Sequence, residues 1–437
     1  MSSTSNKKCR SVCIIGAGAA GFCALRHFIN QEEEFSPVIC YEQSAQIGGT
    51  WNYTDQTGND ENGLPLHTSM YRDLHTNLPM QIMEFPDFPW RQKQSFVHHS
   101  KVLQYLVDYA KHYGLLPYIH LEHHLTRLTR TDDDGQWQVT LCQVKQQHSF
   151  TRTFDILILC PGRHSLPYYS EIPSLTSNFT GSVIHSHDYR RRESYTGQRV
   201  ALIGGGPTGF DLAIEVGSVA AEVVFINRSI FQFENLPANV RQLNGEVVHF
   251  SADSMSVKLK DDSILKFPVD SVILATGYLF NLSYLDQKST AIRLTADNTL
   301  DGLYRHMVNI KYPSMALLGI CQKGVLPFPM YHQQVLYYRK LLLGKIAIPT
   351  IAEMKKEVED DLLMRAAVGY RPKDRHCLKV DLLIEYIRLL ERDAQLTPLK
   401  AVVMKLHADL YPIRCKNICT YKHVDYRILD DKTYEEA

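Results

Sequence analysis

The sequence predicts an α/β fold made of two Rossmann-like dinucleotide-binding domains, and three observations support this. A glycine motif with the spacing G-x-G-x-x-G occurs twice, at 16–21 and at 204–209. Each motif lies between a short apolar stretch and a stretch with helical periodicity, the strand–turn–helix order of a dinucleotide-binding unit. The two motifs are too far apart for a short tandem repeat, so we expect the second domain to be inserted into the first.

Composition excludes several classes of protein. The 437 residues, 44% of them apolar, are enough for two or three domains. Lys plus Arg equals Asp plus Glu at 47 each, and this balance argues against a nucleic-acid partner. The ten cysteines are scattered, which indicates reduced thiols. No Cys/His set has metal-ligand spacing, so we expect no metal.

No uninterrupted apolar run reaches the roughly 18 residues that a membrane-spanning helix needs. The apolar stretch 12–25 resembles a signal peptide, but cleavage there would destroy the first glycine motif. We therefore expect a soluble, cytoplasmic protein without a transmembrane segment. Peripheral attachment to the endoplasmic reticulum and a homodimer stay open.

The first unit starts with a buried strand at 12–15, the glycine turn, a helix at 22–30 and a second strand at 37–42. Residues 44–90 are expected to form an ordered loop. A helix is predicted at 100–114, with Ser100 as N-cap and Gly114 as its end. A turn at 131–135 leads into a strand of a β-meander at 136–141, and a buried strand follows at 154–160.

The same order then begins again. A strand and turn at 199–206 precede a helix at 208–220 and a strand at 222–229, and a late strand follows at 270–278. Between them, residues 230–270 are expected to hold short strands. From about residue 330 onward the pattern is mostly helical.

The first motif is predicted to bind FAD or NAD. Gly16 allows the tight turn, Gly18 lets the backbone approach a pyrophosphate, and Gly21 allows close packing of helix on strand. Glu42 ends the second strand, where an acid binds ribose hydroxyls and repels a 2′-phosphate. The turn is completed by Ala17, Ala19 and Ala20.

A glycine pair follows at 48–49, and two interpretations of this segment stay open. Gly49, Thr50 and Trp51 are candidate FAD contacts, with Trp51 covering part of a flavin. Alternatively, the segment is a surface turn with a Trp in the core.

The second motif is predicted to bind NADPH. Its following strand ends in Arg228 instead of an acid, and a guanidinium matches a 2′-phosphate in charge and bidentate geometry. Further candidate contacts lie at the turn, at the start of the helix and after the late strand: Gly204, Gly206, Pro207, Thr208, Gly209, Asp211, Thr276 and Gly277.

Over roughly residues 10–335 the chain resembles the flavin-containing monooxygenases, the class B flavoprotein N/S-oxygenases. The resemblance rests on elements that occur in the family's order: the two motifs, Glu42, and the segments 48–51, 71–89, 179–189 and 275–278. The family's pattern F-x-G-x-x-x-H-x-x-x-Y is matched by Phe179, Gly181, His185 and Tyr189. Baeyer–Villiger enzymes usually have Trp where this chain has Tyr189, which favours the N/S-oxygenating group. His185 is interpreted as structural or as an interdomain hinge.

The resemblance implies the cofactors, the reaction and the domain plan. FAD would be bound by 1–175 together with 286–437, and NADPH by 176–285. NADPH and O₂ would oxygenate a soft nitrogen or sulfur atom of a small molecule through a C4a-hydroperoxyflavin. Thr76, Asn77 and Leu78 match the family's active-site Asn motif, so Asn77 would hold NADP⁺ and the peroxide. Without the resemblance, Asn77 reads as a turn residue.

The chain also departs from the family. His332 stands where an acidic residue is usual, followed by Gln334, which leaves the role of 325–340 open. The last hundred residues match poorly and lack the apolar tail that anchors vertebrate members, so the chain resembles the shorter soluble insect and fungal members.

Three other functions are compatible with nucleotide-binding glycine motifs. A disulfide reductase needs a redox Cys pair after the first unit, and only Cys40 lies in 40–60. A Baeyer–Villiger ketone monooxygenase and a non-catalytic FAD/NADP-binding redox module remain as alternatives.

Overall fold

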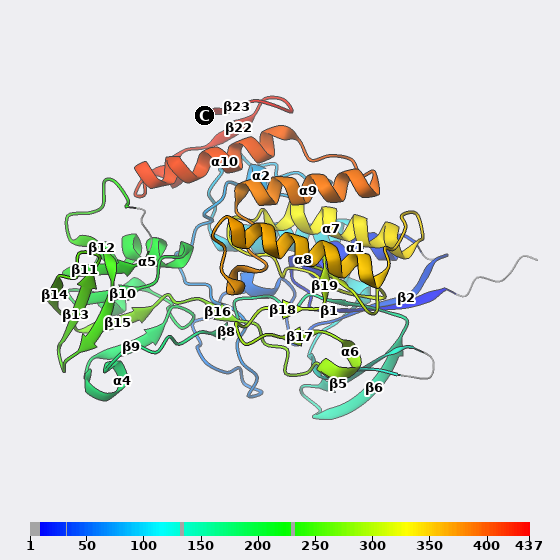
Figure 1. The fold of residues 1–437 in the computed structure, drawn as a ribbon, viewed down its shortest axis with the longest axis horizontal. Helices are drawn as coiled ribbons and strands as arrows, with labels where there is room; N and C mark the ends of the chain where they lie inside the picture. Colours follow the sequence, from blue (N-terminus) through cyan, green and yellow to red (C-terminus); the bar gives the residue numbers. More distant parts are fainter. Residues whose placement is uncertain (1–8, 32, 132–134, 229–231) are drawn as a thin grey trace, which may run out of the picture.

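The computed structural model describes residues 9–31, 33–131, 135–228 and 232–437 (Figure 1). Two seven-stranded sheets organise it. The first has the strand order β19-β20-β21-β7-β1-β2-β3 and the second β14-β13-β12-β11-β10-β15-β9. In Figure 1 the second sheet lies at the left, and the first lies under the helices at the right.

The first sheet is built around β1, which pairs in parallel with β2 and β7. Parallel strands covered on both faces read as near-continuous apolar runs, and all four residues of β7 are buried. The strands of this sheet are β1 (Arg10–Ile15), β2 (Phe35–Tyr41), β3 (Ile119–His120), β7 (Ile156–Leu159), β19 (Leu303–Tyr304), β20 (Val308–Asn309) and β21 (Met315–Leu317).

The second sheet repeats the plan around β10, which pairs in parallel with β11 and β15. Its strands are β9 (Ser182–His185), β10 (Arg199–Ile203), β11 (Glu222–Asn227), β12 (Val240–Phe250), β13 (Ser254–Leu259), β14 (Ile264–Pro268) and β15 (Ser271–Leu274). The prediction of only short strands at 230–270 is wrong for β12, which has 11 residues. Its first half pairs with β11 and its second half with β13, so both halves are stabilised.

Every strand of the second sheet falls between β7 and β21 in the chain. The chain therefore leaves the first sheet, builds the second, and returns, and this confirms the predicted α/β fold with one Rossmann-like unit inserted into the other. The two connections pair with each other as β8 (Leu166–Pro167) and β16 (Tyr278–Leu279). The borders at 175/176 and 285/286 stay predictions.

Smaller sheets complete the strand inventory. The expected β-meander is present as β4 (His123–Arg130), β5 (Trp137–Gln143) and β6 (His148–Phe154). Two hairpins follow: β17 (Arg293–Leu294) with β18 (Leu300–Asp301), and β22 (Tyr426–Ile428) with β23 (Tyr434–Glu436).

The helices are α1 (Ala19–Ile29), α2 (Met80–Met83), α3 (His99–His112), α4 (Leu175–Asn178), α5 (Pro207–Gly217), α6 (Gln287–Thr290), α7 (Pro327–Leu342), α8 (Ile351–Ala367), α9 (Val380–Ala394) and α10 (Ala401–Lys416). Helix α1 packs on β1, β2 and β7 of the first sheet, whereas α5 packs on β10, β11 and β12 of the second. Short 3₁₀ turns are η1 (Gly49–Trp51), η2 (Leu116–Tyr118), η3 (Arg192–Tyr195), η4 (Pro372–Asp374) and η5 (Tyr421–His423). Among the described residues, no helix combines the length and apolar character that a membrane crossing requires.

The predicted cap of α3 is wrong. Ser100 lies inside the helix, and the N-cap is His98, whose Nδ1 accepts a hydrogen bond from the Ser100 backbone N–H at 3.3 Å. The imidazole nitrogen thus accepts the backbone hydrogen bond that a side-chain oxygen, such as a hydroxyl, accepts at most N-caps. Gly114 follows the C-cap residue, as expected, with φ +64°.

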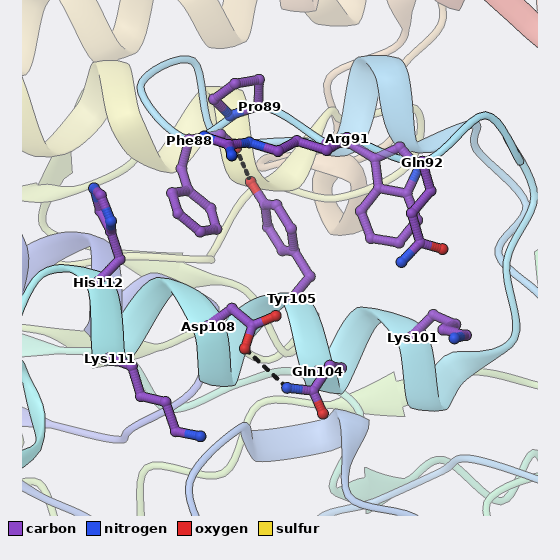
Figure 2. Close-up of a pocket in the computed structure, with 11 residues that line it drawn as sticks. Phe88, Pro89, Arg91, Gln92, Lys101, Gln104, Tyr105, Asp108, Lys111 and His112 are labelled. Carbon is purple, nitrogen blue, oxygen red and sulfur yellow. Dashed lines mark hydrogen bonds between the residues drawn. The ribbon is translucent and has the colours of Figure 1, made fainter.

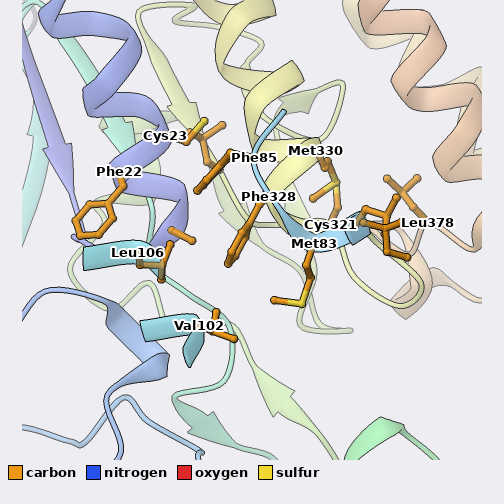
Figure 3. Close-up of a cluster of buried hydrophobic side chains, with 14 of the residues drawn as sticks. Phe22, Cys23, Met83, Phe85, Val102, Leu106, Cys321, Phe328, Met330 and Leu378 are labelled. Carbon is orange, nitrogen blue, oxygen red and sulfur yellow. The ribbon is translucent and has the colours of Figure 1, made fainter. Parts of the chain in front are cut away.

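The main core joins the first unit to the C-terminal helices. Phe85 stacks on Phe328 with 4.9 Å between ring centroids. Figure 3 shows this cluster, which collects buried side chains from α1, α2, α3 and α7: Phe22, Cys23, Met83, Val102, Leu106, Phe328 and Met330. Burying each of these side chains contributes about 1.5–3 kcal/mol, so α7 is held against the helix that follows the first glycine motif.

Candidate functional site

The first glycine motif forms a tight turn between β1 and α1. Gly16 has φ +101°, a conformation that side chains disfavour, and a Cβ there would lie 2.5 Å from the Cys160 carbonyl oxygen. A Cβ on Gly21 would lie 1.8 Å from the Gly16 carbonyl oxygen. Gly18 is the N-cap of α1 and offers no side-chain cap. The first backbone N–H groups of α1 therefore remain available for an anion.

Glu42 lies directly after β2 and reaches back to this turn. Its Oε2 accepts from the Ala17 backbone N–H at 2.7 Å, and its Oε1 accepts from the backbone N–H and hydroxyl of Ser44 at 2.9 and 2.8 Å. A carboxylate has about four acceptor positions, so Glu42 can still accept from ribose hydroxyls. Ala19 and Ala20 occupy the first turn of α1, where Ala19 is buried and Ala20 half-buried.

The 48–51 segment packs directly on the first motif. The Gly48 backbone N–H donates to the Ala17 carbonyl oxygen at 2.9 Å, and a Cβ on Gly49 would lie 3.1 Å from the Gly18 Cα. The Thr50 hydroxyl is buried and makes no hydrogen bond within the described part of the chain. Trp51 is half-buried against the main core. The close approach of the two backbones favours the cofactor interpretation of this segment over that of a surface turn.

Thr76 and Asn77 differ sharply in their surroundings. Thr76 is buried, its backbone N–H donates to the Val97 carbonyl oxygen at 2.9 Å, and its hydroxyl accepts from the Val97 N–H at 3.1 Å. The half-buried Asn77 side chain has no hydrogen-bond partner among the described residues, and Leu78 is half-buried beside it. Thr76 thus fixes the segment and leaves the Asn77 amide free to bind a ligand.

The second glycine motif repeats the geometry of the first. Gly204 has φ +134°, and a Cβ there would lie 2.0 Å from the Ala275 carbonyl oxygen. A Cβ on Gly209 would lie 2.0 Å from the Gly204 carbonyl oxygen, whereas a Cβ on Gly206 would meet nothing within 4 Å. Gly206 caps α5, Pro207 occupies its first turn, and Thr208 is half-buried beside it. The backbone at Gly206 therefore has open space beside it, as the predicted pyrophosphate contact requires.

Arg228 follows the last residue of β11, as predicted. Its side chain is 78% exposed, and its Nη2 lies 2.6 Å from the Glu246 Oε1 on β12. An exposed pair of this kind is worth at most about 1 kcal/mol, so the guanidinium can exchange Glu246 for a phosphate.

Thr276 and Gly277 lie where β15 leaves the second sheet. The Thr276 hydroxyl donates to the Tyr168 carbonyl oxygen, and the Tyr168 N–H donates to the Gly277 carbonyl oxygen at 2.9 Å. The Thr276 side chain therefore holds the paired connections β8 and β16 together. A Cβ on Gly277 would meet nothing within 4 Å.

The segment 179–189 is structural in the described chain. Phe179 packs on Phe250, and a Cβ on Gly181 would lie 2.4 Å from the Phe179 ring. His185 is fully buried, its Nδ1 accepts from the His187 N–H, and burial lowers its pKa to about 4. His185 is therefore neutral at neutral pH, and it lies beside the paired connections with its ring 5.3 Å from that of Tyr278.

One interdomain contact had no sequence signal. Asp211 on α5 accepts from the Tyr71 hydroxyl and from the Lys422 ammonium, the latter at 2.6 Å. Lys422 also donates to the His75 carbonyl oxygen at 3.1 Å. We call Tyr71, Asp211 and Lys422 the interdomain triad. The Asp211 carboxylate is engaged here, and its contact with a cofactor stays a prediction.

His332 lies on α7 and contacts His27 on α1. Its Nδ1 is 3.3 Å from the His27 Nε2 and 3.6 Å from the Asp87 Oδ1. Burial lowers the pKa of both imidazoles. Together with Cys23 they bring three ligand atoms within 4.8 Å of one another. However, the two imidazoles bond each other, and the positive charges of Arg26 and Arg339 act on both. We interpret the group as a neutral His pair in the core.

A surface groove of about 540 Å³ lies between the 88–92 loop and α3 (Figure 2). Phe88 and Tyr105 form its apolar side, and the Tyr105 hydroxyl donates to the Phe88 carbonyl oxygen at 2.6 Å. None of its lining residues belongs to the predicted site, so the groove is separate from the predicted nucleotide contacts.

Comparison with known proteins agrees with this geometry. The family model described as flavin-binding monooxygenase-like matches residues 9–231. Senecionine N-oxygenase of Tyria jacobaeae is 29% identical over 435 residues, covering 97% of this chain and 91% of the relative. The structure of S-allyl-L-cysteine S-oxygenase from Allium sativum has a TM-score of 0.86 at 26% identity, covering 95% of both chains.

A more distant likeness shows the fold alone. Cyclohexanone monooxygenase from Rhodococcus sp. Phi1, solved with NADP⁺, has a TM-score of 0.60 at 12% identity, covering 88% of this chain and 97% of that one. The matched family region contains both glycine motifs, Glu42, Asn77 and the 179–189 segment. On the strength of that match, this chain belongs to the flavin-binding monooxygenase-like family.

Proposed function

We propose that this flavoprotein monooxygenase uses FAD, NADPH and O₂ to oxygenate a nitrogen or sulfur atom of a small nucleophilic molecule. One observation carries the proposal: the segment containing Asn77 is joined to both glycine motifs. Thr76 pairs with Val97 just before α3, and α3 contacts η1, which packs on Gly18. On the other side, Tyr71 donates to Asp211 on α5.

The residues around the first motif fit FAD. The free N–H groups at the start of α1 would bind the pyrophosphate, and Glu42 would accept from the ribose hydroxyls. The buried Thr50 hydroxyl has no protein partner in the described chain, and a buried hydroxyl is costly without one. A flavin or its phosphates would supply that partner.

The residues around the second motif fit NADPH. The space above Gly206 is open, and α5 begins there without a side-chain cap. Arg228 would bind the 2′-phosphate by exchanging its contact with Glu246. Gly277 leaves similar space at the end of β15.

When bound, NADPH supplies a hydride and FAD the chemistry that activates O₂. The chain contributes position and the exclusion of water. In this proposal, the Asn77 amide holds the reacting groups in place, and the paired connections β8 and β16 hold the two nucleotide units together. No protein nucleophile is required, because the substrate atom is itself the nucleophile.

The relatives support nitrogen or sulfur over a ketone as the reacting group. A relative named for N-oxygenation and a structure named for S-oxygenation match over more than nine-tenths of this chain. The ketone monooxygenase matches at 12% identity, which supports the shared fold only. The intact glycine turns at both motifs also argue against a non-catalytic redox module.

The purified protein, loaded with FAD, tests the proposal. It should consume NADPH with N,N-dimethylaniline and with methyl phenyl sulfide, giving the N-oxide and the sulfoxide by mass spectrometry, and give no ester from cyclohexanone. Turnover of the ketone alone would replace this function with the Baeyer–Villiger alternative. The proposed homodimer and peripheral attachment to the endoplasmic reticulum are tested separately, by light scattering and by cell fractionation.

A further inference from the structure

The last part of the chain bridges the two nucleotide units. Near the end of α10, the Arg414 guanidinium lies 4.8 Å from the ring centroid of Phe210 on α5. The Cys415 carbonyl oxygen accepts from the Glu234 N–H at 3.1 Å, and the Lys416 carbonyl oxygen accepts from the Asn235 amide at 3.1 Å. These contacts attach the segment 414–416 to the unit that contains the second glycine motif.

The residues that follow attach to the first unit instead. Tyr421 packs edge-on against Phe96 at 5.3 Å, and the Asp425 Oδ1 accepts from the Ser95 N–H at 2.7 Å. Ser95 in turn accepts from the Tyr426 N–H at 2.7 Å. We call residues 414–426 the C-terminal bridge, and in Figure 1 α10 extends from above the first unit toward α5.

Lys422 lies in the middle of the C-terminal bridge and contacts both units with one ammonium group. It donates to the Asp211 Oδ1 at 2.6 Å and to the His75 carbonyl oxygen at 3.1 Å. Its side chain is 19% exposed. Asp211 comes two residues after Gly209, and His75 comes two residues before Asn77. The lysine therefore connects the start of α5 to the segment that holds Asn77.

Removing the ammonium would leave two groups without their partner. Asp211 would keep only the Tyr71 hydroxyl, and a half-buried carboxylate that loses its cation is destabilised. The His75 carbonyl would lose its link to α5. A displacement of about 1 Å near the reacting groups lowers the reaction rate up to a hundredfold. A loosely held His75–Asn77 segment would therefore affect the reaction as well as the stability of the fold.

We propose that Lys422 is a positioning residue, which fixes the Asn77 segment relative to the second glycine motif. This inference rests on the proposed function for its consequence in catalysis. In the coupled reaction, substrate, NADPH, H⁺ and O₂ give the oxygenated product, NADP⁺ and water. In the uncoupled reaction, NADPH, H⁺ and O₂ give NADP⁺ and hydrogen peroxide. Loss of positioning shifts turnover from the first to the second.

The test compares Lys422→Met with Lys422→Arg and with Lys432→Met, an exposed lysine in the turn between β22 and β23. In Lys422→Met the share of NADPH that ends in peroxide should rise at least about threefold. Lys422→Arg keeps the charge and should restore coupling in part, and Lys432→Met should match wild type. A purely structural role would lower the yield of folded protein and leave this share unchanged, because the share is independent of the amount of active enzyme.

A second readout needs no turnover. Hydrogen exchange followed by mass spectrometry on the full-length protein should show faster exchange in a peptide covering 74–79 for Lys422→Met, and no change there for Lys432→Met. Unchanged exchange or an unchanged peroxide share in Lys422→Met overturns the inference. If wild type oxygenates none of the substrates, the proposed function fails and the exchange result alone decides the role of Lys422.

Discussion

Arg228 and Glu246 form an ion pair across the neighbouring strands β11 and β12, with 2.6 Å between Nη2 and Oε1. Both side chains are mostly exposed, so the pair contributes little to stability. The Glu246 carboxylate is paired with the guanidinium group that would bind a 2′-phosphate. In the proposed site, Glu246 would therefore compete with NADPH for Arg228.

If Arg228 binds the 2′-phosphate as proposed, substitutions of the two residues should have opposite effects. Arg228→Ala should weaken NADPH binding about tenfold to a hundredfold, since it removes a charge-assisted contact of about 1.5–3 kcal/mol. NADH binding should change little. Glu246→Gln should tighten NADPH binding a few-fold, at most about 1 kcal/mol. Titration calorimetry with both nucleotides measures this, with Arg293→Ala as an exposed control, and equal losses for both nucleotides would remove Arg228 from the phosphate site.

Two glycines of the second motif should respond differently to the same substitution. A Cβ on Gly209 would lie 2.0 Å from the Gly204 carbonyl oxygen, whereas one on Gly206 would meet no protein atom within 4 Å. Gly209→Ala should therefore lower the melting temperature, with a cost of about 1–3 kcal/mol. Gly206→Ala should melt as wild type does and bind NADP⁺ at least about tenfold more weakly, because its methyl group fills the pyrophosphate space. Unaltered NADP⁺ affinity in Gly206→Ala would place the pyrophosphate elsewhere.

Asn77 should be needed for oxygenation and not for FAD binding. Asn77→Ala removes an amide that has no hydrogen-bond partner in the described chain, so the fold should be unaffected. We expect the FAD content to stay at the wild-type level and coupled turnover to fall about tenfold or more, as when a positioned donor is lost. Thr76→Ser, which keeps the hydroxyl bonded to Val97, is the matched control. Wild-type turnover in Asn77→Ala would exclude it from the site.

Glu215 should make stability depend on pH. Burial raises the pKa of this carboxyl to about 7, and Asp211 and Asp73 add to the increase, while the Tyr189 hydroxyl that donates to it opposes it. In the unfolded chain the carboxyl loses its proton near its ordinary pKa, about 4.3. Between that pH and 7 the folded state holds more protons, so stability falls as pH rises and levels off above about 7.

Glu215→Gln removes this loss because the amide stays neutral. The variant should be more stable than wild type at pH 8, on the order of 1 kcal/mol, and the difference should shrink toward pH 5. Melting curves from pH 5 to 8 measure it, with the exposed Glu171→Gln as control. A constant difference across that range would show that Glu215 does not titrate there.

The two nucleotide units could be predicted because their signals are local. In each unit these signals lie within one short stretch of chain. They are a strand, a glycine turn, a helix, and the residue that ends the next strand, which is Glu42 in the first unit and Arg228 in the second. Backbone geometry requires glycine in these turns, since a side chain on Gly21 or Gly209 would overlap a carbonyl oxygen of its own turn.

The contacts that join the units could not be predicted in this way. Lys422 is one of many lysines, and its partners His75 and Asp211 lie in two other parts of the chain. His332 stood out as a departure from the family, yet its partner His27 lies on α1 at the other end of the sequence. The predicted N-cap of α3 was wrong for a local reason: His98 occupies the N-cap position, which a serine usually holds.

The central claim is that NADPH and O₂ oxygenate a soft nitrogen or sulfur atom on this protein. Its most direct test is turnover of the FAD-loaded enzyme with NADPH and methyl phenyl sulfide under ¹⁸O₂. We expect a sulfoxide that carries ¹⁸O, formed in near-equal amount to the NADPH consumed. NADPH oxidation that yields only hydrogen peroxide, with no labelled sulfoxide or amine oxide from any substrate tested, would contradict it.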